Sequence, residues 1–316
     1  MPLAYPTLFS SDARRIALKQ LHDINIVTHC INDLDTEIAA WTNHLDYRLL
    51  QQGALPETLC AAWETPADAG LPYAILGPAS GADVYVRFVQ AENRAGYWPP
   101  VTWGWNATEI LVADPDALAV QLEGSPFSRF GGPGDLYVHP KAPRAIQTTG
   151  PSGELLYFTR ITAGGSRYGL HGAKSRVDRV FNVVLGGPSL AKLREFYADK
   201  LGLRVSAPMP FTMTLAAQAT NSSPDALFPI CVAPIRARQS ILELDEYPAT
   251  TAARPRSAGQ LPGGMSMVTF TTGSLDDFPL PFRAKPQIIA AEPYNGRRVA
   301  VIEGPAGEWL ELIEAA

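Results

Sequence analysis

One carboxylate near the end of the chain is placed for acid–base chemistry. Glu311 lies in the apolar segment 309–314, two residues after Trp309. Burial among apolar side chains raises the pKa of a carboxyl toward neutral pH, where it becomes an efficient general base. We therefore expect Glu311 to remove a proton from a substrate. The alternative is a structural acid that pairs with an arginine or faces water.

A polar residue in an earlier apolar segment is the expected partner of this base. Asn182 interrupts the β-branched run 180–185. Its amide could polarise a substrate carbonyl beside Glu311, because alternation along a strand sends both side chains toward one face of a sheet. A structural hydrogen bond is the alternative role of Asn182.

Six further residues are candidates for substrate binding. Aromatic side chains often line pockets for flat apolar ligands, and a few polar groups then orient the ligand. The candidates are Met267, Tyr247, Trp309, Trp105, Arg87 and Asp245. Two alternatives stay open: the tryptophans of segment 97–105 could fill a core or an interface, and the acids Glu243 and Asp245 could face solvent.

The histidines and the common motifs argue against several other activities. His29 falls on the opposite parity from Ile26 and Thr28, so we expect it to be a core histidine facing a covering helix. No GxGxxG, GxxxxGK[ST], GxSxG or HExxH pattern occurs. These absences weigh against nicotinamide, ATP, serine-hydrolase and zincin chemistry.

The segments that must position these residues are repeated along the chain. The closing stretch 304–314 opens with Gly-Pro-Ala-Gly-Glu, and the stretch 150–160 opens with Gly-Pro-Ser-Gly-Glu. Both continue as apolar strands. Half a chain apart, the strands 24–31 and 180–185 each lead into a helix, capped by Asp33 and Ser189 respectively. Such self-similarity predicts a tandem duplication.

Each half contains a second, weaker copy of the strand–helix–strands unit. The segments 108–122 and 267–277 again read as a strand followed by a helix start. We therefore expect four modules, two in a first domain at 24–162 and two in a second domain at 177–316. An N-terminal helical arm at 1–23 precedes them, and a linker at 163–176 joins the two domains.

This pattern resembles the vicinal oxygen chelate superfamily, which includes glyoxalase I, bleomycin-resistance proteins and extradiol dioxygenases. The resemblance is carried by the four strand–helix modules, Leu201-Gly202-Leu203 and the closing Gly-x-x-x-Glu-Leu of 307–312. It implies an α+β fold of tandem βαβββ modules, in which each half rolls eight strands into an open barrel, or cup, with helices outside.

The resemblance also implies where metal ligands would lie. In the second half the matching positions hold Asn182, Met267 and Glu311, and in the first half they hold Ile26, Ala107 and Tyr157. A divalent transition metal generally requires three strong nitrogen or oxygen donors. We therefore expect neither a bound metal nor any other cofactor.

The composition of the chain indicates which kinds of partner it could bind. The chain has 316 residues, a net charge of −5 and three scattered cysteines. These values favour a cytoplasmic protein with reduced thiols and two domains, and they argue against nucleic acid as a partner. No apolar run is long enough to span a membrane. We expect a small-molecule ligand and a monomer or homodimer.

The leading functional hypothesis is a metal-independent isomerase or lyase that acts on a small apolar or aromatic oxygenated compound. Glu311 would be its base and Asn182 its carbonyl partner. The alternatives are a resistance-type protein that sequesters a hydrophobic ligand without turnover, and a ring-cleaving dioxygenase with atypical ligands.

Overall fold

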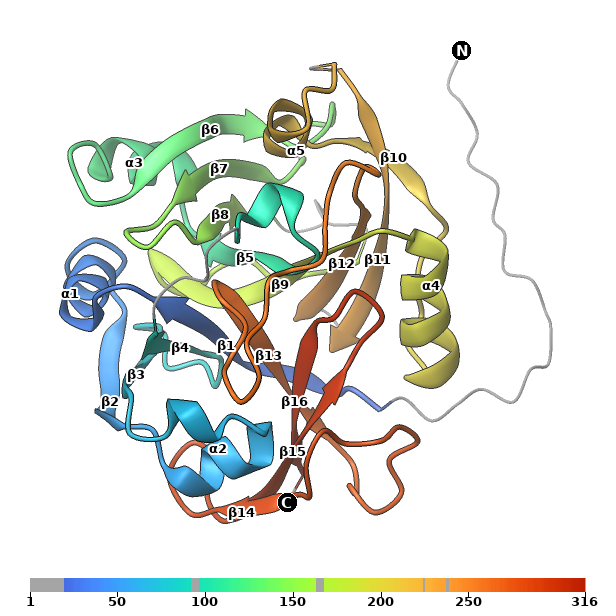
Figure 1. The fold of residues 1–316 in the computed structure, drawn as a ribbon. Coiled ribbons are helices and arrows are strands. Elements are labelled where there is room, and N and C mark those ends of the chain that lie inside the picture. Colours follow the sequence, from blue (N-terminus) through green and yellow to red (C-terminus); the bar gives the residue numbers. More distant parts are fainter. Residues whose placement is uncertain (1–19, 92–96, 163–167, 224, 237–238, 316) are drawn as a thin grey trace.

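The computed structural model describes residues 20–91, 97–162, 168–223, 225–236 and 239–315. Its strands form two eight-stranded sheets (Figure 1), with orders β14-β15-β16-β13-β1-β4-β3-β2 and β10-β11-β12-β9-β5-β8-β7-β6. This architecture confirms the expected α+β fold of repeated modules. The expected N-terminal helix falls mainly on residues 1–19, which lie outside the described residues.

Four modules follow one another along the chain. Module one contains β1 (Asp23–Ile31), α1 (Leu34–His44), β2 (Arg48–Ala54), α2 (Glu57–Trp63), a 3-10 turn (Pro66–Asp68), β3 (Pro72–Gly77) and β4 (Tyr85–Gln90). Module two, after a 3-10 turn (Pro99–Val101), contains β5 (Gly104–Val112), α3 (Pro115–Gln121), β6 (Ser128–Asp135), β7 (Arg144–Thr149) and β8 (Leu155–Arg160).

Module three repeats the plan with shorter helices, whereas module four has no helix in its described residues 265–315, so the helix start expected within 267–277 was wrong. Module three contains β9 (Val177–Gly187), α4 (Leu190–Arg194), which continues as a π-helix (Glu195–Lys200), β10 (Met209–Thr212), α5 (Thr214–Ala219), β11 (Leu227–Arg236) and β12 (Ser240–Glu246). Module four contains β13 (Met265–Thr272), β14 (Gln287–Ile289), β15 (Arg297–Glu303) and β16 (Trp309–Glu314). None of the described helices has the length and apolarity needed to cross a membrane.

The modules pair differently from the expectation that each half closes its own sheet. Strand β1 pairs antiparallel with β13, so module one joins module four. Strand β5 pairs antiparallel with β9, so module two joins module three. The repeated modules present similar strand edges, and their local sequence does not specify which pair will meet. The expected pairing within each half was therefore wrong.

The two sheets pack against each other through their central strands. The largest apolar cluster includes Val27 and Phe270 of one sheet together with Ile110 and Val183 of the other. His29 lies in this interior, 1% exposed, with Nε2 3.2 Å from the Thr108 hydroxyl. Burial lowers the pKa of His29 to about 3, so this core histidine is neutral at physiological pH.

The opposite face of each sheet is concave and differs between the two sheets. We call these faces the β1/β13 cup and the β5/β9 cup. Helix α2 lies over the β1/β13 cup (Figure 1), and Leu59, Cys60 and Trp63 pack there with residues of both modules. An apolar plug therefore fills the β1/β13 cup, whereas the β5/β9 cup retains open space.

Candidate functional site

Glu311 is a buried, fully bonded acid in the β1/β13 cup. Its side chain is 0% exposed. Trp63 Nε1 donates to Oε1 at 2.6 Å, and Arg87 Nη2 donates to Oε2 at 3.1 Å. The hydroxyls of Thr269 and Tyr294 also donate to this carboxylate. These partners leave no oxygen facing a cavity, so the geometry fits the structural, arginine-paired acid rather than the expected base.

Several predicted binding residues surround this ion pair and do not border open space. The Arg87 guanidinium is fully buried, lies 4.5 Å from the centre of the Trp63 ring and donates to the Thr28 hydroxyl. Met267 and Trp309 belong to the same packed cluster. Trp105 is 0% exposed in the core between the sheets, where its indole donates to the Trp309 carbonyl. The structure gives these four residues packing and bonding roles.

The expected catalytic pair is separated. Asn182 lies on β9 and Glu311 on β16, which belong to different sheets. The prediction that they share one cup was wrong, because it assumed that modules three and four close together.

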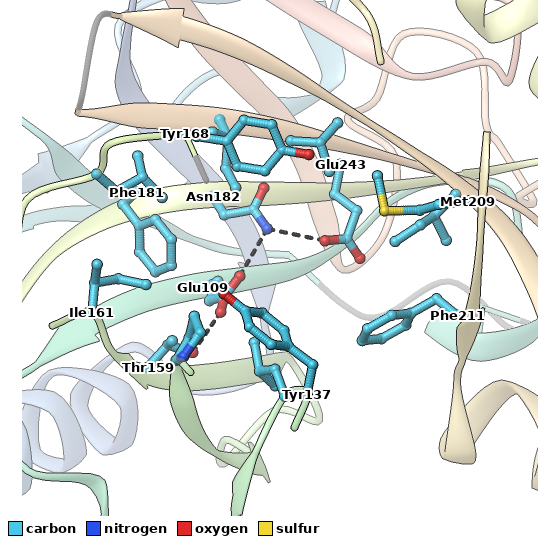
Figure 2. Close-up of a pocket in the computed structure, with 16 residues that line it drawn as sticks. Glu109, Tyr137, Thr159, Ile161, Tyr168, Phe181, Asn182, Met209, Phe211 and Glu243 are labelled. Carbon is cyan, nitrogen blue, oxygen red and sulfur yellow. Dashed lines mark hydrogen bonds between the residues drawn. The ribbon is translucent and has the colours of Figure 1, made fainter. Parts of the chain in front are cut away.

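Asn182 instead meets two carboxylates in the β5/β9 cup (Figure 2). Its Nδ2 donates to Glu109 Oε2 at 2.7 Å and to Glu243 Oε2 at the longer distance of 3.4 Å. Glu109 faces Asn182 across the antiparallel β5–β9 pair, and the Thr159 hydroxyl donates to its second oxygen. The Asn182 Oδ1 has no hydrogen-bond partner among the described residues. One amide therefore bridges two acids at the floor of this cup.

An apolar cavity lies above this cluster. Concave, mostly apolar sites with a few converging polar groups are where proteins usually bind small organic molecules. The side chains around it come from modules two and three and from the segment that joins them, and Figure 2 shows them directed toward the acids. They include Tyr137, Ile161, Tyr168, Phe181, Met209, Phe211 and Val232.

A second cavity adjoins the first and shares Phe211 and Glu243 with it. Two predicted binding residues, Asp245 and Tyr247, line this second cavity. Asp245 is 2% exposed, and its Oδ1 has no hydrogen-bond partner in the described part of the chain. Glu243 and Asp245 thus share the face of β12 that is directed into the cup. Of the two alternatives that the sequence left open, the structure has the cup-facing one.

Burial governs the protonation of these acids. It raises the pKa of Glu243 to about 7, and the nearby Glu109 carboxylate adds to the shift. Burial also raises the pKa of Glu109, although the bonds from Thr159 and Asn182 oppose this shift. The pKa of Asp245 rises well above its usual value because of burial and the charge of Glu243. Glu243 is therefore divided between its two protonation states near neutral pH.

Sheet register shows which functional residues the sequence reasoning missed. In parallel pairs, Glu311 lies opposite Thr269, Tyr157 opposite Glu109 and Glu243 opposite Val184. Arg87 lies opposite Thr28 at the same level of module one. Glu243 is therefore the module-three counterpart of Glu311. Counting the closing strand of every module, rather than that of each half, would have identified it.

The side chains at the expected ligand positions of each cup show whether the cup could hold a divalent metal, which generally requires three strong donors. The β1/β13 cup places Ile26, Met267 and the Arg87–Glu311 pair at the matching positions. The β5/β9 cup places Ala107, Tyr157, Asn182 and Glu243 there, with Glu109 alongside. Asn182 directs N–H groups rather than its oxygen at the acids.

Neither set suits a divalent metal. One contains a cation at a ligand position, and the other has hydrogen-bond donors between its carboxylates. Within the described residues, no group of three histidine, cysteine or acidic side chains is arranged to hold a metal ion.

Comparisons with known proteins agree on the architecture. No protein-family profile and no curated protein sequence matches the chain. Among solved structures, glyoxalase I from Zea mays matches with a TM-score of 0.60 at 16% identity over 92% of each chain. A candidate dioxygenase from Bacillus subtilis matches with a TM-score of 0.60 at 12% identity, over 94% of this chain and 86% of that chain. At these identities the likeness concerns the fold, and the chain has the tandem-module fold of the vicinal oxygen chelate superfamily.

Proposed function

We propose that the β5/β9 cup is the active site of an acid–base enzyme for a small apolar or aromatic carbonyl compound. The observation that carries the proposal is the position of Glu243. This carboxylate borders both cavities, and the described residues give it a single long hydrogen bond, at 3.4 Å. A base that must accept a substrate proton requires such a free oxygen.

The neighbouring groups support distinct roles in the reaction. Glu243 would remove a proton from the carbon next to the substrate carbonyl and return it to another atom, which gives isomerisation, or allow a leaving group to depart. The firmly bonded Glu109 would orient the Asn182 amide, and one N–H of that amide would polarise the carbonyl oxygen. Isomerisation moves a proton within the substrate, and elimination releases the leaving group with its bonding electrons, so neither route requires a redox cofactor.

The cavity wall supports an apolar substrate. Phe181, Phe211 and Val232 surround the acids with carbon, and such surroundings favour aromatic or aliphatic bodies. They also maintain the low local polarity that keeps the pKa of Glu243 near neutral.

Deuterium exchange tests the proposal without knowledge of the product. Carbonyl compounds that raise the melting temperature of the protein would be identified first and then followed by proton NMR in D2O. The wild-type protein should exchange the proton next to the carbonyl of bound compounds. Glu243→Gln should slow this exchange by about 100-fold or more, because general-base catalysis typically contributes that much.

Two outcomes separate this function from ligand sequestration. The control Glu123→Gln removes one negative charge from an exposed residue that lines neither cavity, so this variant should exchange like the wild type. If compounds bind but exchange equally slowly with wild type and Glu243→Gln, the acid–base proposal is wrong and a non-catalytic binding protein is favoured.

A further inference from the structure

The second cavity of the β5/β9 cup contains a carboxylate that the proposed proton transfer does not use. Asp245 lies on β12, two residues after Glu243, and is 2% exposed. Asp245 lines the cavity, and its Oδ1 has no hydrogen-bond partner among the described residues. A buried acid without a partner is costly to ionise, so it remains protonated until a bound cation supplies the missing interaction.

The charged side chains that line the two cavities are all acidic, while the buried Arg254 lies behind the second cavity, where it donates to the Asn106 side-chain oxygen at 3.3 Å. Glu109, Glu243 and Asp245 line the cavities, and none of the other lining residues in the described chain is a lysine, arginine or histidine. A positively charged ligand could therefore neutralise the acids that line the cavities. The Asn182 Oδ1, also without a partner in the described chain, adds another hydrogen-bond acceptor beside these acids.

Aromatic side chains border the same space as Asp245. Tyr157, Tyr247 and Phe211 line the second cavity. The Tyr247 ring packs against Gly186, where an added Cβ would meet ring atoms at 2.4 Å, so this glycine permits its position. Aromatic faces attract ammonium groups, most strongly where water is excluded. Carboxylates and aromatic rings together are the usual surroundings of a bound organic cation.

We propose that the second cavity binds the ammonium group of an organic amine whose apolar body occupies the adjoining first cavity. Asp245 is the counter-ion, and the rings of Tyr157 and Tyr247 complete the ammonium site. Glu243 then lies between the two parts of the ligand, because it borders both cavities. This inference rests on the proposed function and deepens it by naming the substrate class: small amphiphilic amines that carry a carbonyl group.

Isothermal titration with a matched series of probes tests the assignment. Phenylbutylamine, phenylbutanol and phenylbutyrate share one apolar body and differ in the charge of the end group. The wild-type protein should bind the amine at least about tenfold more tightly than the alcohol, and should bind the carboxylate weakest. Equal affinity for amine and alcohol, or no binding of millimolar amine, would overturn the proposal.

Variants assign the preference to Asp245. Asp245→Asn, with Asp245→Ala as a second variant, should lose the preference for amine over alcohol while alcohol affinity changes little. Thermal melting verifies that both variants are folded. Glu123→Gln, with the same change of net charge at the surface, should keep the preference. Retention of the preference in both folded Asp245 variants would contradict the assignment.

The two proposals can fail separately. Titration measures binding and requires no turnover, so a clear amine preference without deuterium exchange refutes only the acid–base function. Exchange that depends on Glu243, together with equal affinities for the amine and alcohol probes, refutes only the ammonium site.

Discussion

Four residues at one strand position show how surroundings decide the role of a side chain. Arg87, Tyr157, Glu243 and Glu311 occupy the same level of the four modules. Glu311 lies beside Arg87 and is fully bonded, whereas Glu243 has no cationic neighbour among the described residues and borders open space. Two chemically identical acids thus differ because one cup supplies a counter-ion and the other a cavity.

The Arg87–Glu311 pair should be costly to break on one side. Arg87→Met leaves a buried carboxylate without its counter-ion, which should lower the free energy of unfolding by about 3–5 kcal/mol in urea titrations. The double variant Arg87→Met with Glu311→Leu should recover much of the loss, because no charge remains buried. Arg298→Met, in a partly exposed pair, should cost less than about 1 kcal/mol. If Arg87→Met and Arg298→Met lower the free energy of unfolding equally, burial of the Arg87–Glu311 pair does not increase the cost of breaking it.

The repeated turn before each closing strand has a physical explanation. In the turn 304–308, the Glu308 carboxylate folds back and accepts a hydrogen bond from the Ala306 amide at 2.8 Å. Glu154 does the same with the Ser152 amide at 3.1 Å. An added Cβ at Gly304 would lie 1.9 Å from the Glu308 carboxylate, so a larger residue there would displace this carboxylate from the turn.

The two turns differ in what their glutamates meet next. Glu308 accepts a hydrogen bond from the Tyr197 hydroxyl at 2.9 Å. Glu154 instead lies near Glu37 of helix α1, and burial together with the charge of Glu37 raises the pKa of Glu154 well above its usual value. The turn 150–154 therefore brings two buried acids, Glu154 and Glu37, close enough for their negative charges to repel each other.

Relief of this repulsion should stabilise the protein. Glu37→Gln removes one of the charges, so it should raise the melting temperature at pH 8. Each unit of pKa shift that is relieved adds about 1.4 kcal/mol to the free energy of unfolding. The gain should vanish at about pH 3, where both acids are protonated in the folded and unfolded chain. Asp35→Asn, on the exposed face of the same helix, is the matched control and should change little. A loss of stability in Glu37→Gln at pH 8 would contradict this account.

Local features of the sequence predicted most elements but not their partners. The caps at Asp33 and Ser189 and the opening strands depend on neighbouring residues, and the structure has them as expected. Helix α2 was not predicted, because its apolar side depends on the cup that it fills. Asn182 was correctly expected to face a cup, whereas its true partner, Glu109, is fixed by pairing across 73 residues. Such pairing leaves no local signal.

The whole molecule carries an unusual set of buried acids. Burial raises the pKa of both Glu243 and Glu308 from 4.5 to about 7. It also raises the pKa of Glu109, Glu154 and Asp245. The folded chain therefore holds protons more tightly than the unfolded chain. The stability from these groups is complete below pH 4.5 and is lost as the pH rises through about 7.

Scanning calorimetry across pH tests this balance. His29 acts in the opposite direction, because its pKa falls from 6.5 to about 3 and stability is lost as the pH drops between those values. The acids outnumber it, so the melting temperature should fall by about 5 °C between about pH 5 and pH 8. Glu308→Gln should flatten this dependence. A melting temperature that rises steadily over the same range would show that the acids are not buried as described.

The crossed pairing of modules has a consequence for the ancestry of the chain. A half-length precursor with two modules could not have closed either sheet by itself in this arrangement. Two identical half-length chains could complete both sheets only as a symmetric pair, with each chain contributing one module to each sheet. In such a pair the two sheets would be equivalent, whereas in the present chain one sheet is filled by helix α2 and the other borders open cavities.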